Sequence, residues 1–312
     1  MKNGFSSVLK ACAAAILLGV VLCVVGAAGG GSATLYPDWQ SVFSVRWSLG
    51  KAEPAQLSFG AAQPGTVYSL NISCDAGEVN LRKGKEFAVH TNREDLVSAR
   101  LEGNTFTVSC TMGEGFWHAD DVELTVTVPE NAKLDQALLS VDAGELTAEQ
   151  LSFEQLTCEV NAGSTKLDKI AVAGASSLHI GVGELEAERL STQDFSCTID
   201  AGSAELNELE CRGVSDVSVD LGQASLSGRF DDDVRLNVST GGIELDAQRP
   251  AEYGYRLEAG TGSIEIDGQE FSGFGMEQTY QENAAVLFDI SCDLGEVVVN
   301  FTDSAAPQPS RL

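Results

Sequence analysis

The feature that most constrains this chain is a short phrase that it repeats about every twenty residues. Each central copy can be numbered from a shared glycine, and the steps between successive glycines are 19, 20, 19, 20, 19 and 21 residues. The glycines of the central copies are Gly144, Gly163, Gly183, Gly202, Gly222, Gly241 and Gly262, and outlying copies carry Gly77 and Gly295. A fixed period of this length predicts a solenoid, in which each repeat forms one coil and neighbouring coils stack.

Apolar residues alternate with polar ones on both sides of each glycine. They stand five and three residues before it and two and four residues after it, as Cys197, Ile199, Ala204 and Leu206 do around Gly202. Alternation with a period of two predicts short β-strands with one buried face, and glycine suits the corner between them because it adopts positive φ freely. We therefore expect an all-β, single-stack β-solenoid of coils about 19–20 residues long.

An acidic or amide residue stands two places before several of the glycines. Asp142, Asn161, Asp200 and Asp220 occupy this position. Side chains of this kind bond to the backbone of turns, so we expect them to stabilise the corner through nearby backbone groups.

The remaining segments are expected to flank the repeats, which occupy residues 139–303. Strand-like pieces separated by turns in residues 67–138 predict wider hairpins that form the first coils or a capping sheet. Residues 268–284 are predicted to be a hairpin-like insertion or covering loop, and residues 304–312 a loose tail. Residues 29–66 are expected to be a juxtamembrane linker or cap. Their aromatic stretch, residues 38–47, either closes the end of the solenoid or lies at the membrane surface.

An uncharged run near the start predicts a membrane segment. Residues 11–28 contain no charged side chain, and they follow a short start, residues 1–10, that carries Lys2 and Lys10. As a helix rising ~1.5 Å per residue, the run is just long enough for a bilayer core. The lysines predict a cytoplasmic start and an extracytoplasmic C-terminal domain on a single-pass protein. A cleaved signal peptide, which would release the protein, is the alternative.

The charge balance restricts the partners of the chain. The formal net charge is −27 over 312 residues. Such a surface repels the phosphates of nucleic acids and the head groups of anionic lipids, so no nucleic-acid partner is expected. Since 43% of the residues are apolar and recur regularly, we expect a folded body with an acidic surface.

Cysteines are frequent but show no metal-binding spacing. Outside residues 11–28 the chain has Cys74, Cys110, Cys158, Cys197, Cys211 and Cys292, without a CxxC motif. Most are expected to be small buried side chains. Cys158 and Cys197 share a column two coils apart, at roughly 9.6 Å, which is too far for a disulfide. The pairing of Cys74 with Cys110 stays open.

The sequence contains only weak candidates for catalytic or metal-binding groups. The three histidines, His90, His118 and His179, share no column of the repeat, so no Ser-His-Asp or Cys-His site is predicted. Carboxylates are expected to stack on successive coils in three pairs: Asp200 with Asp220, Glu186 with Glu205, and Glu244 with Glu265. Such pairs serve enzymes that cleave polysaccharides, but they also suit corners and solvated faces. Asp200 and Asp220 are weak candidates for a divalent cation. No catalytic residue and no cofactor are predicted.

Several segments resemble one known family. They are Gly-Gly-Gly-Ser at residues 29–32, CDAGEVNLRKGKEFAVHTN at 74–92, VELTVTVPENAKL at 122–134, the repeated coils, and YGYRLEAGTGSIEID at 253–267. The chain is similar here to a bacterial family of putative adhesins with β-strand repeats, a domain of unknown function. The resemblance implies an envelope protein, sometimes beside envelope-stress systems, and it brings no catalytic residues.

These observations lead to an expected role without catalysis. We expect a surface binding or scaffold module of the bacterial envelope, whose outward coil faces contact an envelope or surface protein or a glycan. The alternatives are a sensory or regulatory component of the envelope-stress response and a carbohydrate-active β-helix enzyme.

Overall fold

The protein is an elongated all-β stack, as the repeat predicted. The structure is a computed structural model that describes residues 55–112 and 122–303. The predicted membrane segment, the aromatic stretch at residues 38–47, His118 and the tail lie outside these ranges. The part of the chain that the structure describes contains no helix long and apolar enough to cross a bilayer.

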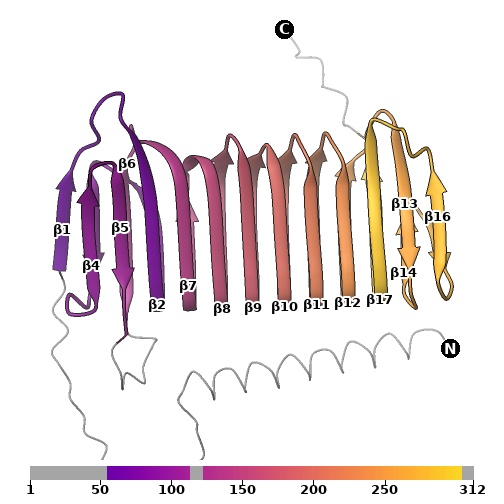
Figure 1. Cartoon of the computed structure of the whole chain (residues 1–312), viewed down its shortest axis with the longest axis horizontal. Helices are drawn as coiled ribbons and strands as arrows, with labels where there is room; N and C mark the ends of the chain where they lie inside the picture. Colours follow the sequence, from indigo (N-terminus) through magenta and orange to yellow (C-terminus); the bar gives the residue numbers. More distant parts are fainter. Residues whose placement is uncertain (1–54, 113–121, 304–312) are drawn as a thin grey trace, which may run out of the picture.

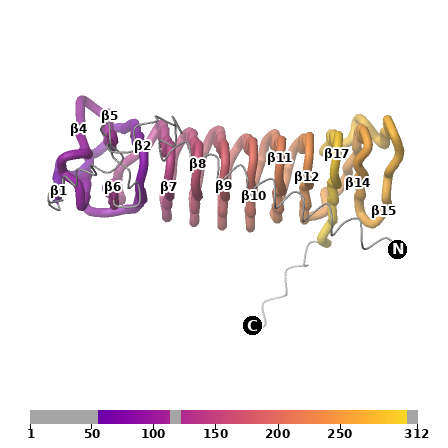
Figure 2. Tube along the Cα trace, turned by 90° about the horizontal axis from the view of Figure 1, so that it is seen from below, coloured from indigo at the N-terminus to yellow at the C-terminus, as the bar shows by residue number. Residues whose placement is uncertain are grey.

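The body is a row of long strands that run parallel and in register (Figure 1). They are β2 (Val67–Gly84), β7 (Lys133–Glu149), β8 (Ser152–Val172), β9 (Ala175–Thr192), β10 (Asp194–Cys211), β11 (Ser215–Phe230), β12 (Val234–Gln248) and β17 (Val286–Thr302). Each corner glycine pairs with that of its neighbour, as Gly163 does with Gly183 and Gly183 with Gly202. Seen from below, the coils follow one another along a single axis (Figure 2).

The corner glycines are required for two reasons. Eight of the nine predicted corner glycines have φ between +133° at Gly77 and +153° at Gly202, a conformation that side chains disfavour. They are also stacked in contact, because a Cβ built on Gly163 would overlap the carbonyl oxygen of Gly144. The ninth prediction, Gly262, is wrong in this respect: its φ lies outside that range, and β13 (Tyr253–Ala259) ends before it. It still lies against Gly295, so a Cβ would not fit there either.

The four predicted inward columns form the core. Their residues are buried in every coil, from Ile72 and Cys74 in β2 to Val297 and Val299 in β17. A further inward column lies seven residues before the glycine. It contains Leu70, Ala137, Leu156, Ser176, Phe195, Ser215, Val234, Tyr255 and Phe288.

Each central coil also bends a second time, which the sequence analysis did not predict. Six residues after the corner glycine, Gln150, Lys169, Arg189 and Glu208 adopt φ of 56–58°. Inward residues follow on the next flank, in pairs from successive coils: Leu151 and Phe153, Ile170 and Val172, Leu190 and Thr192, Leu209 and Cys211. A third bend, such as the one at residues 173–174, leads into the next coil. The central coils therefore have three flanks, and more core than the four columns supply.

Antiparallel strands close the N-terminal end. On one flank, β1 (Ala55–Gly60) pairs with β3 (Phe87–Thr91), and β3 pairs with β6 (Glu123–Pro129). On the other flank, β4 (Val97–Glu102) pairs with β5 (Thr105–Cys110). Both sets join the stack through parallel pairing of β5 and β6 with β2. Ring contacts of Phe87 with Tyr68 and Phe106, at 4.8 and 5.2 Å, fill this end.

The C-terminal end departs from the order of the sequence. The last strand, β17, pairs with β12 on one side and with β13 and β14 (Ser263–Ile266) on the other. The Gly295 coil is therefore inserted between the Gly241 and Gly262 coils. Residues 268–284 contain β15 (Gln269–Ser272) and β16 (Met276–Tyr280), which pair antiparallel with β14 and β13 and cover the outer edge.

Candidate binding faces of the solenoid

The flank that precedes the corner glycines carries an outward surface rich in hydroxyl groups, which we call the hydroxyl face. Its first row contains Leu138, Thr157, Ser177, Ser196, Asp216 and Arg235, and its second row Ser140, Glu159, His179, Thr198, Ser218 and Asn237. Register pairing places successive members of a row one strand apart, at ~4.8 Å. On β9 and β10 the two rows hold Ser177, His179, Ser196 and Thr198, and the nearby carboxylate of Asp200 is paired with His179 at 3.2 Å. Such a surface can both donate and accept hydrogen bonds at regular intervals.

The flank that follows the glycines is charged, and we call it the acidic face. Its outward residues on β7, β8, β9, β10 and β12 include Glu145, Glu149, Lys166, Asp168, Glu184, Glu186, Glu188, Glu205, Glu244 and Asp246. Lys166 lies 2.9 Å from Glu186 on the next coil and neutralises part of the charge. The two flanks thus differ in chemistry although they share one repeat.

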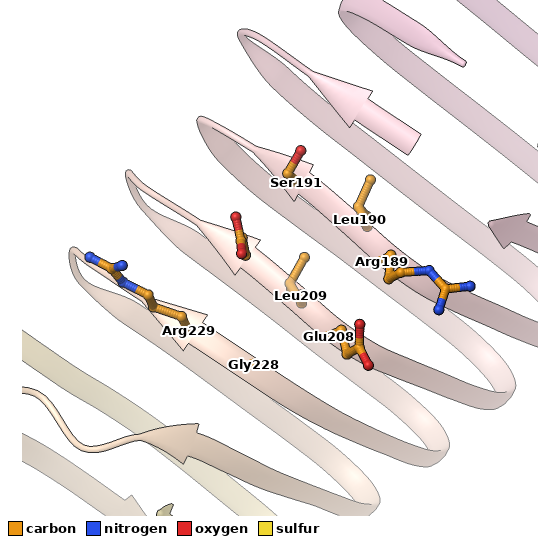
Figure 3. Close-up of a pocket in the computed structure, with 8 residues that line it drawn as sticks. Arg189, Leu190, Ser191, Glu208, Leu209, Gly228 and Arg229 are labelled. Carbon is orange, nitrogen blue, oxygen red and sulfur yellow. The ribbon is translucent and has the colours of Figure 1, made fainter. Parts of the chain in front are cut away.

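An open groove of about 510 Å³ lies on the third flank, across β9, β10 and β11. It arises where β10 has one residue more than β11, so that the register shifts and Leu209 pairs with Gly228. A side chain at Gly228 would overlap the carbonyl oxygen of Leu209, so glycine keeps the two strands close here. Figure 3 shows Arg189, Glu208 and Arg229 projecting from these three neighbouring strands. No sequence motif predicts the groove, because it depends on a difference of one residue between two stacked strands.

The arginines of the groove already have carboxylate partners. Arg189 lies 2.7 Å from Asp168, and Arg229 lies 2.7 Å from Asp231. These hydrogen bonds raise the pKa of both guanidinium groups. Lys169 and Arg189 together hold the pKa of the Asp168 carboxyl below its usual value. The positive charges of the groove are therefore neutralised by carboxylates of the protein, and the groove is not a free cationic site for a ligand.

The two weak cation candidates lie on neighbouring coils, and each has a partner on an adjacent strand. Asp200 Oδ2 is 3.2 Å from His179 Nε2, and Asp220 Oδ1 accepts a hydrogen bond from Ser239 Oγ at 3.4 Å. Within residues 55–112 and 122–303, no group of three or more His, Cys, Asp or Glu side chains is arranged to hold a metal ion. The residues two places before the glycines were expected to hydrogen-bond to nearby backbone. These contacts instead join side chains on neighbouring strands, and Asn161 Nδ2 likewise donates a hydrogen bond to Asp142 Oδ1.

Of two further predicted carboxylate pairs, one lies on neighbouring strands and the other does not. Glu186 and Glu205 are register partners on β9 and β10, as expected. The pairing of Glu244 with Glu265 is wrong, because both are register partners of Val298 in the inserted strand β17. The histidines stay apart: His90 is exposed on β3, while His179 lies on the hydroxyl face.

The six cysteines of the described ranges are buried free thiols. Leu178 separates Cys158 from Cys197, as predicted. Burial raises the pKa of each of these two thiols to about 12, so neither is a ready nucleophile. Cys74 and Cys110, by contrast, are direct register partners on β2 and β5.

The solved structures that are similar to this chain are only distantly related to it. A search of curated protein sequences finds no match. One similar solved structure is a putative adhesin from Bacteroides fragilis, with 12% identity and a TM-score of 0.43, and the match covers 79% of this chain and 97% of that chain. A second is a putative adhesin from Parabacteroides merdae, with 12% identity and a TM-score of 0.38, and the match covers 82% of this chain and 96% of that chain. A third is a putative lipid binding protein from Parabacteroides distasonis, with 10% identity and a TM-score of 0.31, and the match covers 80% of this chain and 98% of that chain. These likenesses are too distant to carry a functional argument.

A family model also matches most of this chain. The sequence model of the family Toastrack DUF4097 matches residues 67–299, from the first long strand to the inserted last strand. This range includes every corner glycine of the stack and agrees with the family resemblance of the repeat. The chain belongs to the Toastrack DUF4097 family.

Proposed function

We propose that this protein is a non-enzymatic binding or scaffold module of the bacterial envelope and that the hydroxyl face is its contact surface. The observation that carries the proposal is the in-register rows of this face, which place hydroxyl groups on neighbouring strands: Thr157, Ser177 and Ser196 in the first row, and Thr198 and Ser218 in the second. A rigid, flat and periodic surface suits a partner that is itself extended and repetitive. Similar solved structures are described as putative adhesins, which agrees with such a role, but the proposal does not rest on them.

The partner class follows from the charge. A net charge of −27 opposes approach of anionic polymers, whereas on β9 and β10 the two rows of the hydroxyl face contain no carboxylate, and nearby Asp200 is paired with His179. We therefore propose a neutral glycan chain of the envelope as the ligand. Residues 11–28 would hold the module at the cell membrane with its C-terminal domain extracytoplasmic.

The test compares two double variants in a pull-down of the full-length protein with insoluble neutral envelope polysaccharide. Ser196→Glu with Thr198→Glu places two charges at the centre of the hydroxyl face and should reduce the bound fraction at least about 10-fold. Ser203→Glu with Ser225→Glu adds the same charge to the acidic face and should leave binding unchanged. Equal binding by all three proteins would refute the assignment of the face.

A second pull-down, from detergent-solubilised envelopes, and an assay of the glycan released in the first one separate the other roles. Retention of a specific envelope protein, with no glycan bound, would favour the sensory or regulatory alternative. Release of shortened glycan by the protein, lost in Glu208→Gln with Glu210→Gln in the groove, would favour the enzyme alternative.

A further inference from the structure

Two cysteines far apart in the sequence meet where the N-terminal closing strands join the stack. Cys74 of β2 and Cys110 of β5 are register partners in a parallel pair. Neighbouring strands lie ~4.8 Å apart, inside the ~4.4–6.8 Å between Cα atoms that a disulfide spans. Cys158 and Cys197 share another inward column, five residues before their glycines, but are separated by a whole strand, so they provide a built-in comparison.

The two thiols share one environment. Both side chains are 1% exposed, and both point to the carbonyl oxygen of Ala76, at 3.3 Å from Cys74 Sγ and 4.0 Å from Cys110 Sγ. The thiols also hydrogen-bond to each other, which lowers the pKa of Cys110 and, together with burial, raises that of Cys74. The two thiols therefore titrate as a pair, in which the thiolate of one is stabilised by the S–H group of the other.

We propose that Cys74 and Cys110 form a disulfide that locks the N-terminal closing strands onto the first long coil in an oxidising compartment. The crosslink would join β5 to β2 and enclose residues 75–109, which include β3 and β4. Because the end of a solenoid has neighbours on one side only, it is the natural place for its unfolding to begin. A covalent link there stabilises the part of the stack that packing supports least.

The oxidant is a small-molecule disulfide such as oxidised glutathione. The thiolate of one cysteine of the pair attacks one sulfur of the oxidant, forms a mixed disulfide and expels one thiolate. The thiolate of the other cysteine then attacks Sγ of the first, closes the protein disulfide and expels the second thiolate. The two protons of the cysteines pass to the two departing thiolates, so the protein loses two hydrogens and the oxidant is reduced to two thiols. Since both thiols are buried, exchange in the folded protein requires local opening of the closing strands.

The experiment oxidises full-length protein in detergent with glutathione redox buffer, both folded and during refolding from denaturant, where burial protects no thiol. Remaining thiols are then alkylated, and the peptides are identified by mass spectrometry. We expect a peptide that links Cys74 to Cys110, while Cys158 and Cys197 are recovered alkylated. Oxidation should raise the melting temperature by roughly 5–15 °C, and reductant should reverse the shift.

Two variants make the result specific. Cys110→Ala should abolish the shift between oxidised and reduced protein, whereas Cys158→Ala should keep it. The proposal is overturned if Cys74 and Cys110 are recovered alkylated after refolding in oxidant, if either ends as a stable glutathione adduct, or if the link forms without moving the melting temperature.

Discussion

At the scale of single residues, position within the coil decides what a side chain does. Ile199 is fully buried three places before its glycine, whereas Ser203, one place after the glycine, is exposed. Successive side chains of a strand point to opposite faces, so neighbours in sequence have opposite roles. Substitutions at such neighbours test the assignment of the two faces directly.

Ile199→Asp should destabilise the protein by about 4 kcal/mol or more, because it removes core volume and buries an unpaired carboxylate. Ser203→Asp introduces the same side chain four residues away on the outer surface and should change the free energy of unfolding by no more than about 0.5 kcal/mol. Chemical denaturation monitored by circular dichroism compares the two. A similar loss of stability in both variants would contradict the inward and outward assignment.

The corner glycines provide a second residue-scale test. Gly202→Ala should cost about 3 kcal/mol or more, because φ is +153° and the new Cβ would overlap the carbonyl oxygen of Gly183. Gly103 also has positive φ, +59°, but nothing lies within 4 Å of a Cβ built there, so Gly103→Ala should cost only about 1 kcal/mol. Thermal unfolding of both variants measures the difference. Equal costs would mean that the backbone conformation, and not the contact between coils, explains these glycines.

At the scale of elements, the ends of the stack differ from its middle. In the middle, each coil stacks on the coil that follows it in sequence, so β8 pairs with β9 and β9 with β10. At the C-terminal end, β17 enters between β12 and the β13–β14 pair. The inserted strand takes the regular glycine corner, whereas β13 and β14 are shorter and carry the antiparallel cover of β16 and β15.

Deletion of residues 286–312 should therefore damage more than the end of the chain. Without β17, β12 keeps β11 on one side but loses its partner on the other side, and the short β13 and β14 cannot supply the full length of pairing there. We expect the amides of Val234–Gln248 to exchange hydrogen at least about 10-fold faster, as measured by mass spectrometry.

The control for this deletion removes residues 304–312 only and should leave exchange in β12 unchanged. If β12 stays protected after loss of β17, then the Gly262 coil can replace the inserted strand, and the order of coils at this end is not unique.

At the scale of the whole molecule, the stack spreads a large negative charge along one elongated body. The acidic face places like charges opposite each other, as with Glu186 and Glu205. Repulsion between exposed charges is screened by salt. Electrostatics therefore act against this fold at low ionic strength, and burial of the inward columns must outweigh them.

The melting temperature should accordingly rise between 10 mM and 500 mM NaCl. Glu205→Gln removes one member of a like-charge pair and should stabilise the protein by about 0.5 kcal/mol in low salt and by almost nothing in high salt. Glu186→Gln is the matched variant that also loses the ion pair with Lys166, so its gain should be smaller. A melting temperature that falls with added salt would show that ion pairs outweigh repulsion across the surface.

The sequence by itself determined the architecture of the coil. Period-2 alternation around a recurring glycine was enough to predict an all-β solenoid, its four inward columns and eight of its nine corner glycines. The reason is local: alternation decides which side chains face inward, and positive φ decides where a strand can turn.

Only the tertiary structure decided which coils are neighbours at the ends, and where the contact surfaces lie. All coils present the same backbone edge, so the repeat cannot specify that β17 is inserted, that Glu244 and Glu265 are separated by Val298, or that Cys74 meets Cys110. The groove above Gly228 likewise depends on a one-residue difference between stacked strands. These features follow from long-range pairing, which depends on the length and packing of whole coils and is not encoded in any single repeat.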